Sequence, residues 1–104
     1  MNPHSVQPPT LPGLMTLYEL TDALDLRLEI TRYPNHHGRF SASLPGVEIK
    51  GDRVLMSAVG QGTSPETAMD KLAKAISGSI LVQGANSPGR KETLVPHIVF
   101  VRPA

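Results

Sequence analysis

The stretch that decides the fold is RFSASLPGVEIKGDRVLMSAVG, residues 39–60. Apolar and polar residues alternate along it: Phe40, Ala42 and Leu44 share one face, and VEIK repeats the pattern. PG separates two expected strands, and GD turns the chain back into a third, which runs through RVLMSAVG. Connections this short allow hairpins and leave no room for a crossover. We therefore predict an antiparallel sheet.

A further strand is predicted before this stretch. Leu24, Leu26, Leu28 and Ile30 alternate with polar residues, the pattern of a half-buried strand. PNHHG, residues 34–38, then has the composition of a turn.

The N-terminal part of the chain divides into an arm and a short helix. Residues 1–13, MNPHSVQPPTLPG, are rich in proline and offer little to bury, so we predict a disordered or extended arm. Thr16 and Glu19 have the spacing of a capping box, and leucines then recur at helical spacing. Residues 14–104 are expected to form a single domain.

The main helix is predicted directly after the hairpins. Ser64 suits the N-cap, Pro65 the first turn and Glu66 the positive end of the helix dipole, and Gly78 ends the helix. One apolar stripe consists of Ala68, Met69, Leu72, Ala73 and Ile76.

After the helix, SILV leads into a flexible loop at residues 83–93 and a closing apolar segment, LVPHIVFV. The predicted fold class is α+β. An antiparallel sheet of three to five strands carries one main helix on one face, with a small extra helix near the N-terminus. The closing segment would be better buried by a partner chain than left at a sheet edge, which predicts a homo-oligomer.

Composition excludes several classes of protein. The chain has 104 residues and a net charge of +1, which argues against a nucleic-acid coat that works by bulk positive charge. It contains no cysteine, so disulfides and thiolate metal sites are excluded. The sequence lacks a membrane-spanning apolar run and a signal peptide, so we expect a soluble cytoplasmic protein that needs no cofactor.

The segment GQGTSPE before the main helix could bind an anion, because backbone N–H groups at a helix start attract phosphate. It lacks the GK[ST] of a P-loop, and Glu66 opposes an anion there, so a tight turn is the favoured interpretation. The adjacent His36 and His37 would point apart, which favours a surface pair over a metal site. No nucleophile elbow, HExxH or paired-acid pattern indicates an enzyme.

Basic residues mark two regions, one along the first strands and one in the late loop. Arg90 and Lys91 stand among glycine, serine and proline, where a mobile loop could clamp a phosphate. The alternative is a solvated loop that keeps the protein soluble, and the residues alone leave both open.

The element order also resembles that of a double-stranded RNA-binding domain, with a helix, three strands and a helix between Leu14 and Ser77. Those domains grip phosphates with lysines at the start of the last helix. Here that place reads SPETAMDK, with an acid first. A nucleic-acid-binding or protein-interaction module is therefore the alternative function.

A second resemblance covers Leu26 to Pro96. The segment GQGTSPETA, then ISG and LV, then a loop with arginine and a closing VP, resembles the small phage proteins of the first Thoeris anti-defence family. The resemblance implies a non-enzymatic protein that sequesters cyclic ADP-ribose isomers or related cyclic nucleotides in an infected bacterium. It also implies dimers, which can assemble into hexamers, with pockets between protomers.

The resemblance assigns ligand-binding positions one by one. They are Phe40, Gly60, Gln61, Gly62, Thr63, Arg90 and Lys91. An apolar wall would hold the adenine, backbone and hydroxyl donors the ribose and phosphates, and arginine the pyrophosphate. The chain departs from the family in its proline-rich arm, its short first helix and its few aromatic residues. The residue that stacks on the adenine stays open among Tyr18, Tyr33, Phe40 and Phe100.

Overall fold

The computed structural model describes residues 13–34 and 38–100. Most of the arm predicted at residues 1–13, the pair His36 and His37, and residues 101–104 lie outside the described residues. The elements are β1 (Met15–Thr16), α1 (Leu17–Leu24), β2 (Glu29–Arg32), β3 (Phe40–Lys50), β4 (Leu55–Gly62), α2 (Pro65–Ile76), β5 (Ile80–Gln83), β6 (Lys91–Leu94) and β7 (Ile98–Val99).

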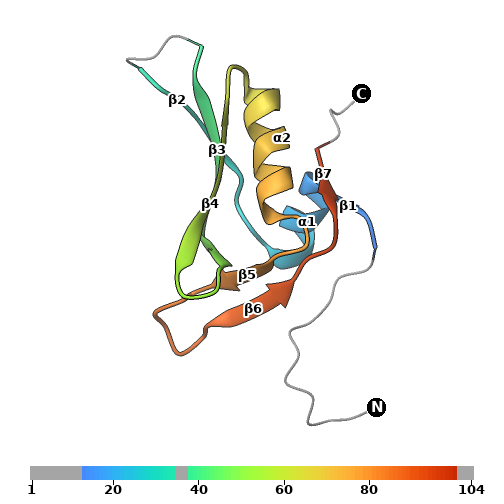
Figure 1. Cartoon of the computed structure of the whole chain (residues 1–104), viewed down its shortest axis with the longest axis vertical. Helices are drawn as coiled ribbons and strands as arrows, with labels where there is room; N and C mark the ends of the chain where they lie inside the picture. The colour runs from blue at the N-terminus through green and yellow to red at the C-terminus, as the bar shows by residue number, and fades with distance from the viewer. Residues whose placement is uncertain (1–12, 35–37, 101–104) are drawn as a thin grey trace.

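The main sheet has five strands and is antiparallel throughout. Strand β3 lies at its centre, with β4 along one side (Figure 1). On the other side β2 pairs with the first half of β3 and β5 with the second half, while β6 pairs with β5. The predicted α+β class, with an antiparallel sheet and one helix packed on it, is confirmed.

The PG dipeptide does not separate two strands as expected. Pro45 and Gly46 lie within β3, where the pairing register with β4 shifts between Ser43 and Glu48. Gly46 has a φ of 77°, a left-handed conformation that glycine adopts without strain. The irregularity is a β-bulge, and it divides β3 into the half that pairs with β2 and the half that pairs with β5.

Helix α2 begins and ends where the sequence predicts. The Ser64 hydroxyl accepts a hydrogen bond from the Thr67 N–H at 3.0 Å, and Pro65 occupies the first turn. The helix ends at Ile76, and Gly78 follows with a φ of 69°. The whole predicted stripe, Ala68, Met69, Leu72, Ala73 and Ile76, is buried.

The first helix is confirmed, but the strand after it is shorter than predicted. Thr16 and Glu19 form the full capping box, and Leu24 belongs to α1 rather than to a strand. Asp25, in the left-handed conformation with a φ of 53°, ends the helix, and β2 begins at Glu29. Leucines at helical spacing run directly into leucines at alternate spacing, so the sequence pattern did not locate the boundary.

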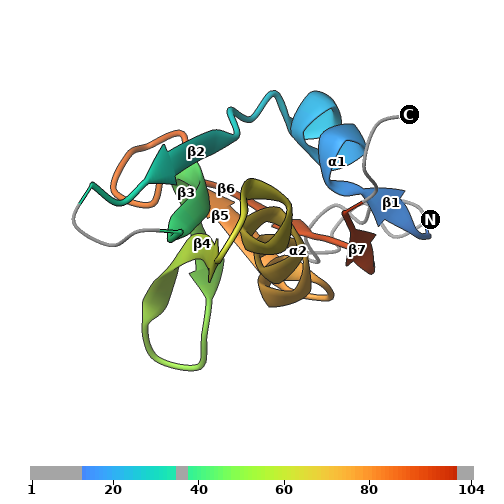
Figure 2. The same cartoon turned by 90° about the horizontal axis from the view of Figure 1, so that it is seen from above.

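The closing segment is also divided. Leu94 ends β6, whereas Ile98–Val99 forms β7 and pairs in parallel with β1 in a separate two-stranded sheet. Helix α2 lies between the main sheet and this small layer of β1, β7 and α1 (Figure 2). Val95 and Ile98 are each 1% exposed, so this chain buries its closing segment itself. This burial weakens the reason for which the sequence predicted an oligomer, and the oligomer stays a prediction.

In the part of the chain that the structure describes, neither helix has the length and apolar character needed to cross a membrane.

Candidate functional site

The predicted glycine loop before α2 is not a loop. Gly60, Gln61 and Gly62 are the last residues of β4, and Gly60 and Gly62 are paired with Ala42 and Phe40 of β3. A Cβ atom on Gly60 would lie 2.2 Å from the Leu72 backbone nitrogen. The glycines are therefore explained by close packing of the helix on the strand.

The start of α2 supports the tight-turn interpretation. A Cβ atom on Gly62 would lie 2.6 Å from the Thr67 side chain, so this glycine also faces the helix. The cap at Ser64 already takes the Thr67 N–H. Thr63 is exposed directly before the cap, and Phe40 is half-buried against the core.

Gln61 has its partner across β3, in the residue that follows β2. Its Nε2 donates to the Tyr33 hydroxyl at 3.0 Å. Gln61 is opposite Ser41 in register, so it lies on the sheet face away from α2, whereas Gly60 and Gly62 lie on the face toward it. The predicted segment therefore contributes to both faces.

Arg90 ends a compact turn between β5 and β6. The Ser87 N–H donates to the Gly84 carbonyl at 3.0 Å, and the Arg90 N–H donates to the Ser87 carbonyl at 3.2 Å. Gln83 and Lys91–Thr93 belong to strands, so the long flexible loop predicted at residues 83–93 is reduced to residues 84–90. Lys91 is the first residue of β6.

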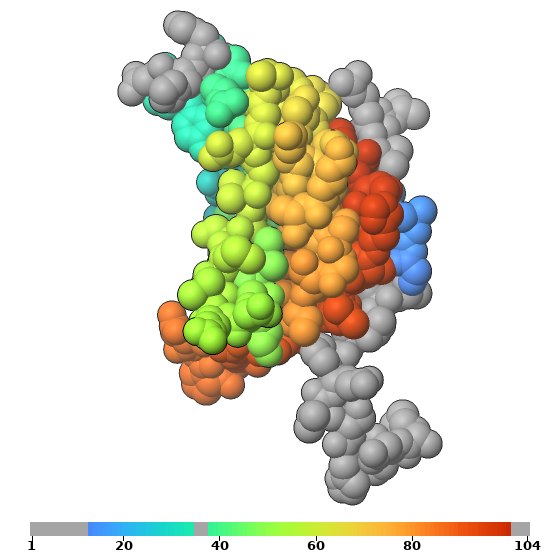
Figure 3. Space-filling model, in the orientation of Figure 1, coloured from blue at the N-terminus to red at the C-terminus, as the bar shows by residue number. Residues whose placement is uncertain are grey.

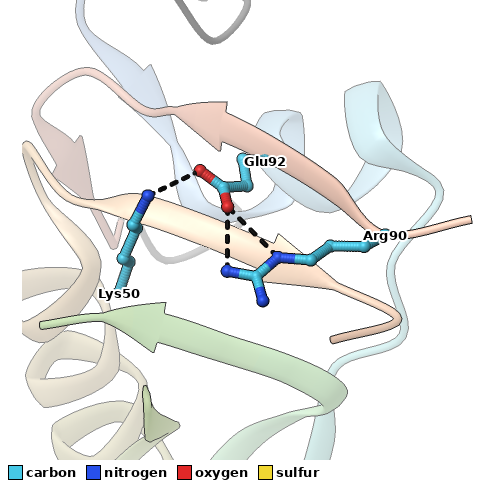
Figure 4. Close-up of polar contacts among 3 residues, drawn as sticks. All are labelled: Lys50, Arg90 and Glu92. Atoms are coloured by element: carbon cyan, nitrogen blue, oxygen red, sulfur yellow. Dashed lines mark hydrogen bonds and ion pairs between the residues drawn. The ribbon is translucent and has the colours of Figure 1, made fainter. Parts of the chain in front are cut away.

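Two charged side chains of this hairpin meet a third, Lys50, from the end of β3 (Figure 4). Glu92 Oε2 accepts from Arg90 Nε at 3.1 Å and from Arg90 Nη2 at 2.8 Å, while its Oε1 accepts from Lys50 Nζ at 3.0 Å. Hydrogen bonds from Lys50 and then from Arg90 lower the pKa of Glu92 below its ordinary value. The remaining guanidinium nitrogen of Arg90 points away from the carboxylate (Figure 4). We name Lys50, Arg90 and Glu92 the charged triad.

Sequence reasoning missed two members of the triad. Lys50 precedes the β3–β4 turn, and Glu92 is separated from it by 42 positions in the sequence. The spacing RKE offers a local signal for the Arg90–Glu92 pair, because alternate residues of a strand share a face. Nothing local indicates Lys50.

The predicted site residues fall into two groups at opposite ends of the sheet. Arg90 lines a shallow cavity of about 250 Å³ with the Lys50–Leu55 turn, next to the first residue of β4. The other group lies at the far end of β4. Gly62 is the last residue of β4, Phe40 of β3 pairs with it, and Thr63 follows it. At about 3.3 Å per residue, the 8 residues of β4 separate the two groups by about 23 Å. One chain alone does not bring them together.

A groove of about 630 Å³ lies at the bulge of β3, and we name it the bulge groove. Its lining includes Ser43, Glu48, Ser57 and Val59 from the sheet and residues 84–87 from the β5–β6 turn. By register these four sheet residues share the face away from α2. The groove's lining combines hydroxyls, a carboxylate and turn backbone with apolar side chains such as Leu44 and Val59.

The structure offers no metal centre among its described residues, since no group of three or more His, Cys, Asp and Glu side chains comes together there. Comparisons with models of protein families, with curated proteins and with solved structures returned no match for this chain.

Proposed function

We propose that this chain is a phage-encoded anti-defence protein that binds and sequesters a cyclic adenine nucleotide of the cyclic ADP-ribose type without cleaving it. The proposal rests on the resemblance of Leu26 to Pro96 to the first Thoeris anti-defence family and on the geometry at Arg90. The protein would act in the cytoplasm of the infected bacterium.

The orientation of Arg90 is the observation that carries the proposal. A guanidinium has five N–H donors in a rigid fork, and Glu92 takes two of them through one oxygen. Since Glu92 also accepts from Lys50, the carboxylate is fixed from two sides and holds the arginine in place. The donors on the far side of the guanidinium suit a bidentate contact to phosphate.

The size of the bulge groove is a second argument for a small-molecule ligand. Its volume of about 630 Å³ falls within the roughly 300–1,000 Å³ of ligand pockets. Ser43, Ser57 and Asn86 offer hydroxyl and amide groups of the kind that bind ribose hydroxyls. Arg90 comes three residues after the groove's turn wall, residues 84–87.

The start of α2 favours a nucleotide over duplex RNA. Glu66 lies in the first turn, where an RNA-binding domain would place lysines. Lys74 lies in the last turn and pairs with Asp70 at 3.0 Å. The main helix therefore offers little positive charge at the end where phosphates would be gripped.

A capture experiment tests the proposal. The protein is incubated with cyclic ADP-ribose isomers and cyclic dinucleotides, separated from free ligand, and denatured by heat. Mass spectrometry of the supernatant should recover an intact cyclic nucleotide. A linear product would indicate an enzyme, and recovery of no nucleotide would contradict the proposal.

Calorimetry then tests the site. Arg90→Ala should weaken binding of the captured nucleotide by about 1.5–3 kcal/mol, roughly 10- to 150-fold, because a charged bidentate contact is lost. Arg27→Ala is the matched control, since Arg27 is exposed and pairs with Glu29 at 3.4 Å far from the triad in sequence. Equal losses in both variants would indicate a general charge effect rather than a site at Arg90.

A further inference from the structure

Glu48 is the one charged side chain among the described residues that line the bulge groove. It is partly buried on β3, the central strand of the sheet. Within the part of the chain that the structure describes, its carboxylate forms no hydrogen bond or ion pair, whereas Glu92 is engaged by both Lys50 and Arg90. The carboxylate oxygens of Glu48 therefore keep their acceptor capacity for a ligand.

The groups around Glu48 suit a ligand with hydroxyls. Ser57 lies directly opposite it in register on β4, where the Cβ atoms of facing residues are about 4.5–5.5 Å apart. Ser43 and Asn86 also line the groove, and their side chains both donate and accept hydrogen bonds. Val59 adds an apolar wall. A small ring that carries neighbouring hydroxyl groups would satisfy both kinds of lining.

Positive charge lies beside the groove rather than in it. Glu48 and Glu92 lie on either side of Val82 in register, two strand spacings or about 10 Å apart on the same face. Glu92 holds the Arg90 guanidinium on that face (Figure 4). Figure 3 shows the orange β5–β6 turn, residues 84–90, against the green β3–β4 hairpin. A free carboxylate and an arginine can therefore contact two parts of one small ligand.

We propose that Glu48 accepts hydrogen bonds from the 2′ and 3′ hydroxyls of a ribose whose phosphate is bound by Arg90, and that it selects ligands in which this cis-diol is free. The two oxygens of a carboxylate match two neighbouring hydroxyls, as an acidic residue does in dinucleotide-binding folds. Glu48 would repel a phosphate in the same place, so the sugar occupies the groove. An ammonium group suits it less, because it offers no acceptor to the donors of Ser57 and Asn86.

The proposal narrows the choice of nucleotide, and this step rests on the proposed function. Cyclic ADP-ribose closes its ring through a pyrophosphate and a glycosidic bond, so a ribose cis-diol stays free. In a 3′,5′-linked cyclic dinucleotide each 3′ oxygen belongs to a phosphodiester, and no cis-diol is left. Glu48 therefore favours ligands of the cyclic ADP-ribose type over cyclic dinucleotides.

Calorimetry with two small nucleotides tests Glu48 separately from the proposed function. The probes are adenosine 5′-monophosphate (AMP) and its 2′,3′-dideoxy analogue, which differ in the diol alone. The wild type should bind AMP at least about 10-fold more tightly than the analogue, because hydrogen bonds to a charged group are lost with the diol.

Glu48→Gln should reverse the effect of the carboxylate in opposite directions for the two probes. It should bind AMP at least about 10-fold more weakly than the wild type. It should bind the dideoxy analogue equally or more tightly, because a charge that repels phosphate is gone. Asp70→Asn removes a negative charge from α2, which covers the other face of the sheet, and should change neither affinity.

Three results would overturn the role of Glu48. They are equal titrations of the wild type with both probes at millimolar concentration, a Glu48→Gln variant that binds AMP as tightly as the wild type or more tightly, and tighter wild-type binding of phosphoethanolamine than of AMP, which would assign the groove to an amine. The comparison of the two probes needs no variant, so it decides the question even if circular dichroism shows that Glu48→Gln is unfolded.

Nucleotide capture separates this proposal from the proposed function. A wild type that captures no cyclic nucleotide but prefers AMP in a manner that depends on Glu48 contradicts the function alone. Capture of a cyclic nucleotide with the same affinity by wild type and Glu48→Gln contradicts the role of Glu48 alone.

Discussion

The two faces of the main sheet are built on different principles. The face toward α2 is closed by shape: Gly60 and Gly62 remove side chains so that the helix backbone can lie directly on the strand. The opposite face carries the bulge groove and the charged triad, where polar groups are held by neighbours from distant strands. The covered face is closed by packing, and the open face holds the polar groups that the proposed function would use.

Gly60→Ala should lower the free energy of unfolding most, because it adds an atom between β4 and α2 on the covered face. The added Cβ would lie 2.2 Å from the Leu72 nitrogen and 2.5 Å from the Ala68 carbonyl oxygen, and backbone atoms cannot rotate away. We expect a loss of roughly 3 kcal/mol or more in the free energy of unfolding, at or above the upper range for overpacking. Urea denaturation followed by circular dichroism measures it.

Gly89→Ala is the matched control for this prediction. Its added Cβ would have the Ser87 hydroxyl as its nearest neighbour, at 3.8 Å, an ordinary contact. The same substitution should therefore change the free energy of unfolding by less than about 1 kcal/mol. If Gly60→Ala were as stable as Gly89→Ala, the packing explanation for the glycine would be wrong.

The contrast between the faces also explains what the sequence could predict. The caps at Thr16 and Ser64 involve residues within three positions, and hairpin turns are local as well, so helices and antiparallel order follow from the sequence. The role of Gly60 depends on where α2 packs against β4. No local sequence pattern distinguishes a glycine required for such packing from a glycine in a phosphate-binding loop. Gly60 was therefore predicted at the end of a strand and at the start of a tight turn, and its packing role was not identified.

The site was less predictable than the fold. Arg90 was identified as a candidate, but the groups that orient it come from pairing between β3, β5 and β6. Lys50 reaches Glu92 across β5, and a sequence pattern does not show which strands are neighbours. The PG bulge that shapes the groove was read as a break between strands, because proline and glycine are commoner in turns.

Val82 is a residue of the open face whose packing can be tested by mutation. It lies between Glu48 and Glu92 in register, on the open face, yet it is 0% exposed. The Lys50–Glu92 bridge spans β5 above it. Val82→Ala should lower the free energy of unfolding by about 2 kcal/mol.

Val59→Ala gives the comparison for Val82→Ala. Both remove the same atoms from the same face, but Val59 is 36% exposed. Its loss should stay below about 1 kcal/mol in the same denaturation assay. Equal losses would mean that the triad does not shield Val82.

Ser64→Ala should have a smaller effect at the end of the covering helix. It removes the cap that accepts the Thr67 N–H, which typically costs about 1 kcal/mol. Thr63→Ala, one residue earlier and exposed, should change the unfolding midpoint much less. If Thr63→Ala lowered the unfolding midpoint as much as Ser64→Ala, the assignment of Ser64 as the helix cap would be wrong.

The smallest expected effect is the pH dependence of the triad. Lys50 and Arg90 lower the pKa of Glu92, so the carboxylate binds a proton less readily in the folded chain than in the unfolded chain. Its stabilisation is therefore complete above the ordinary glutamate pKa of about 4.3 and is lost as the pH falls through the lower folded value. In thermal melts taken between about pH 6 and 3, the melting temperature of Glu92→Gln should therefore fall less steeply with decreasing pH than that of the wild type. Glu29→Gln, which removes an exposed carboxylate paired with Arg27, is the control. If the melting temperature of wild type and Glu92→Gln fell equally with decreasing pH, the triad would hold Arg90 without contributing to the pH dependence of stability.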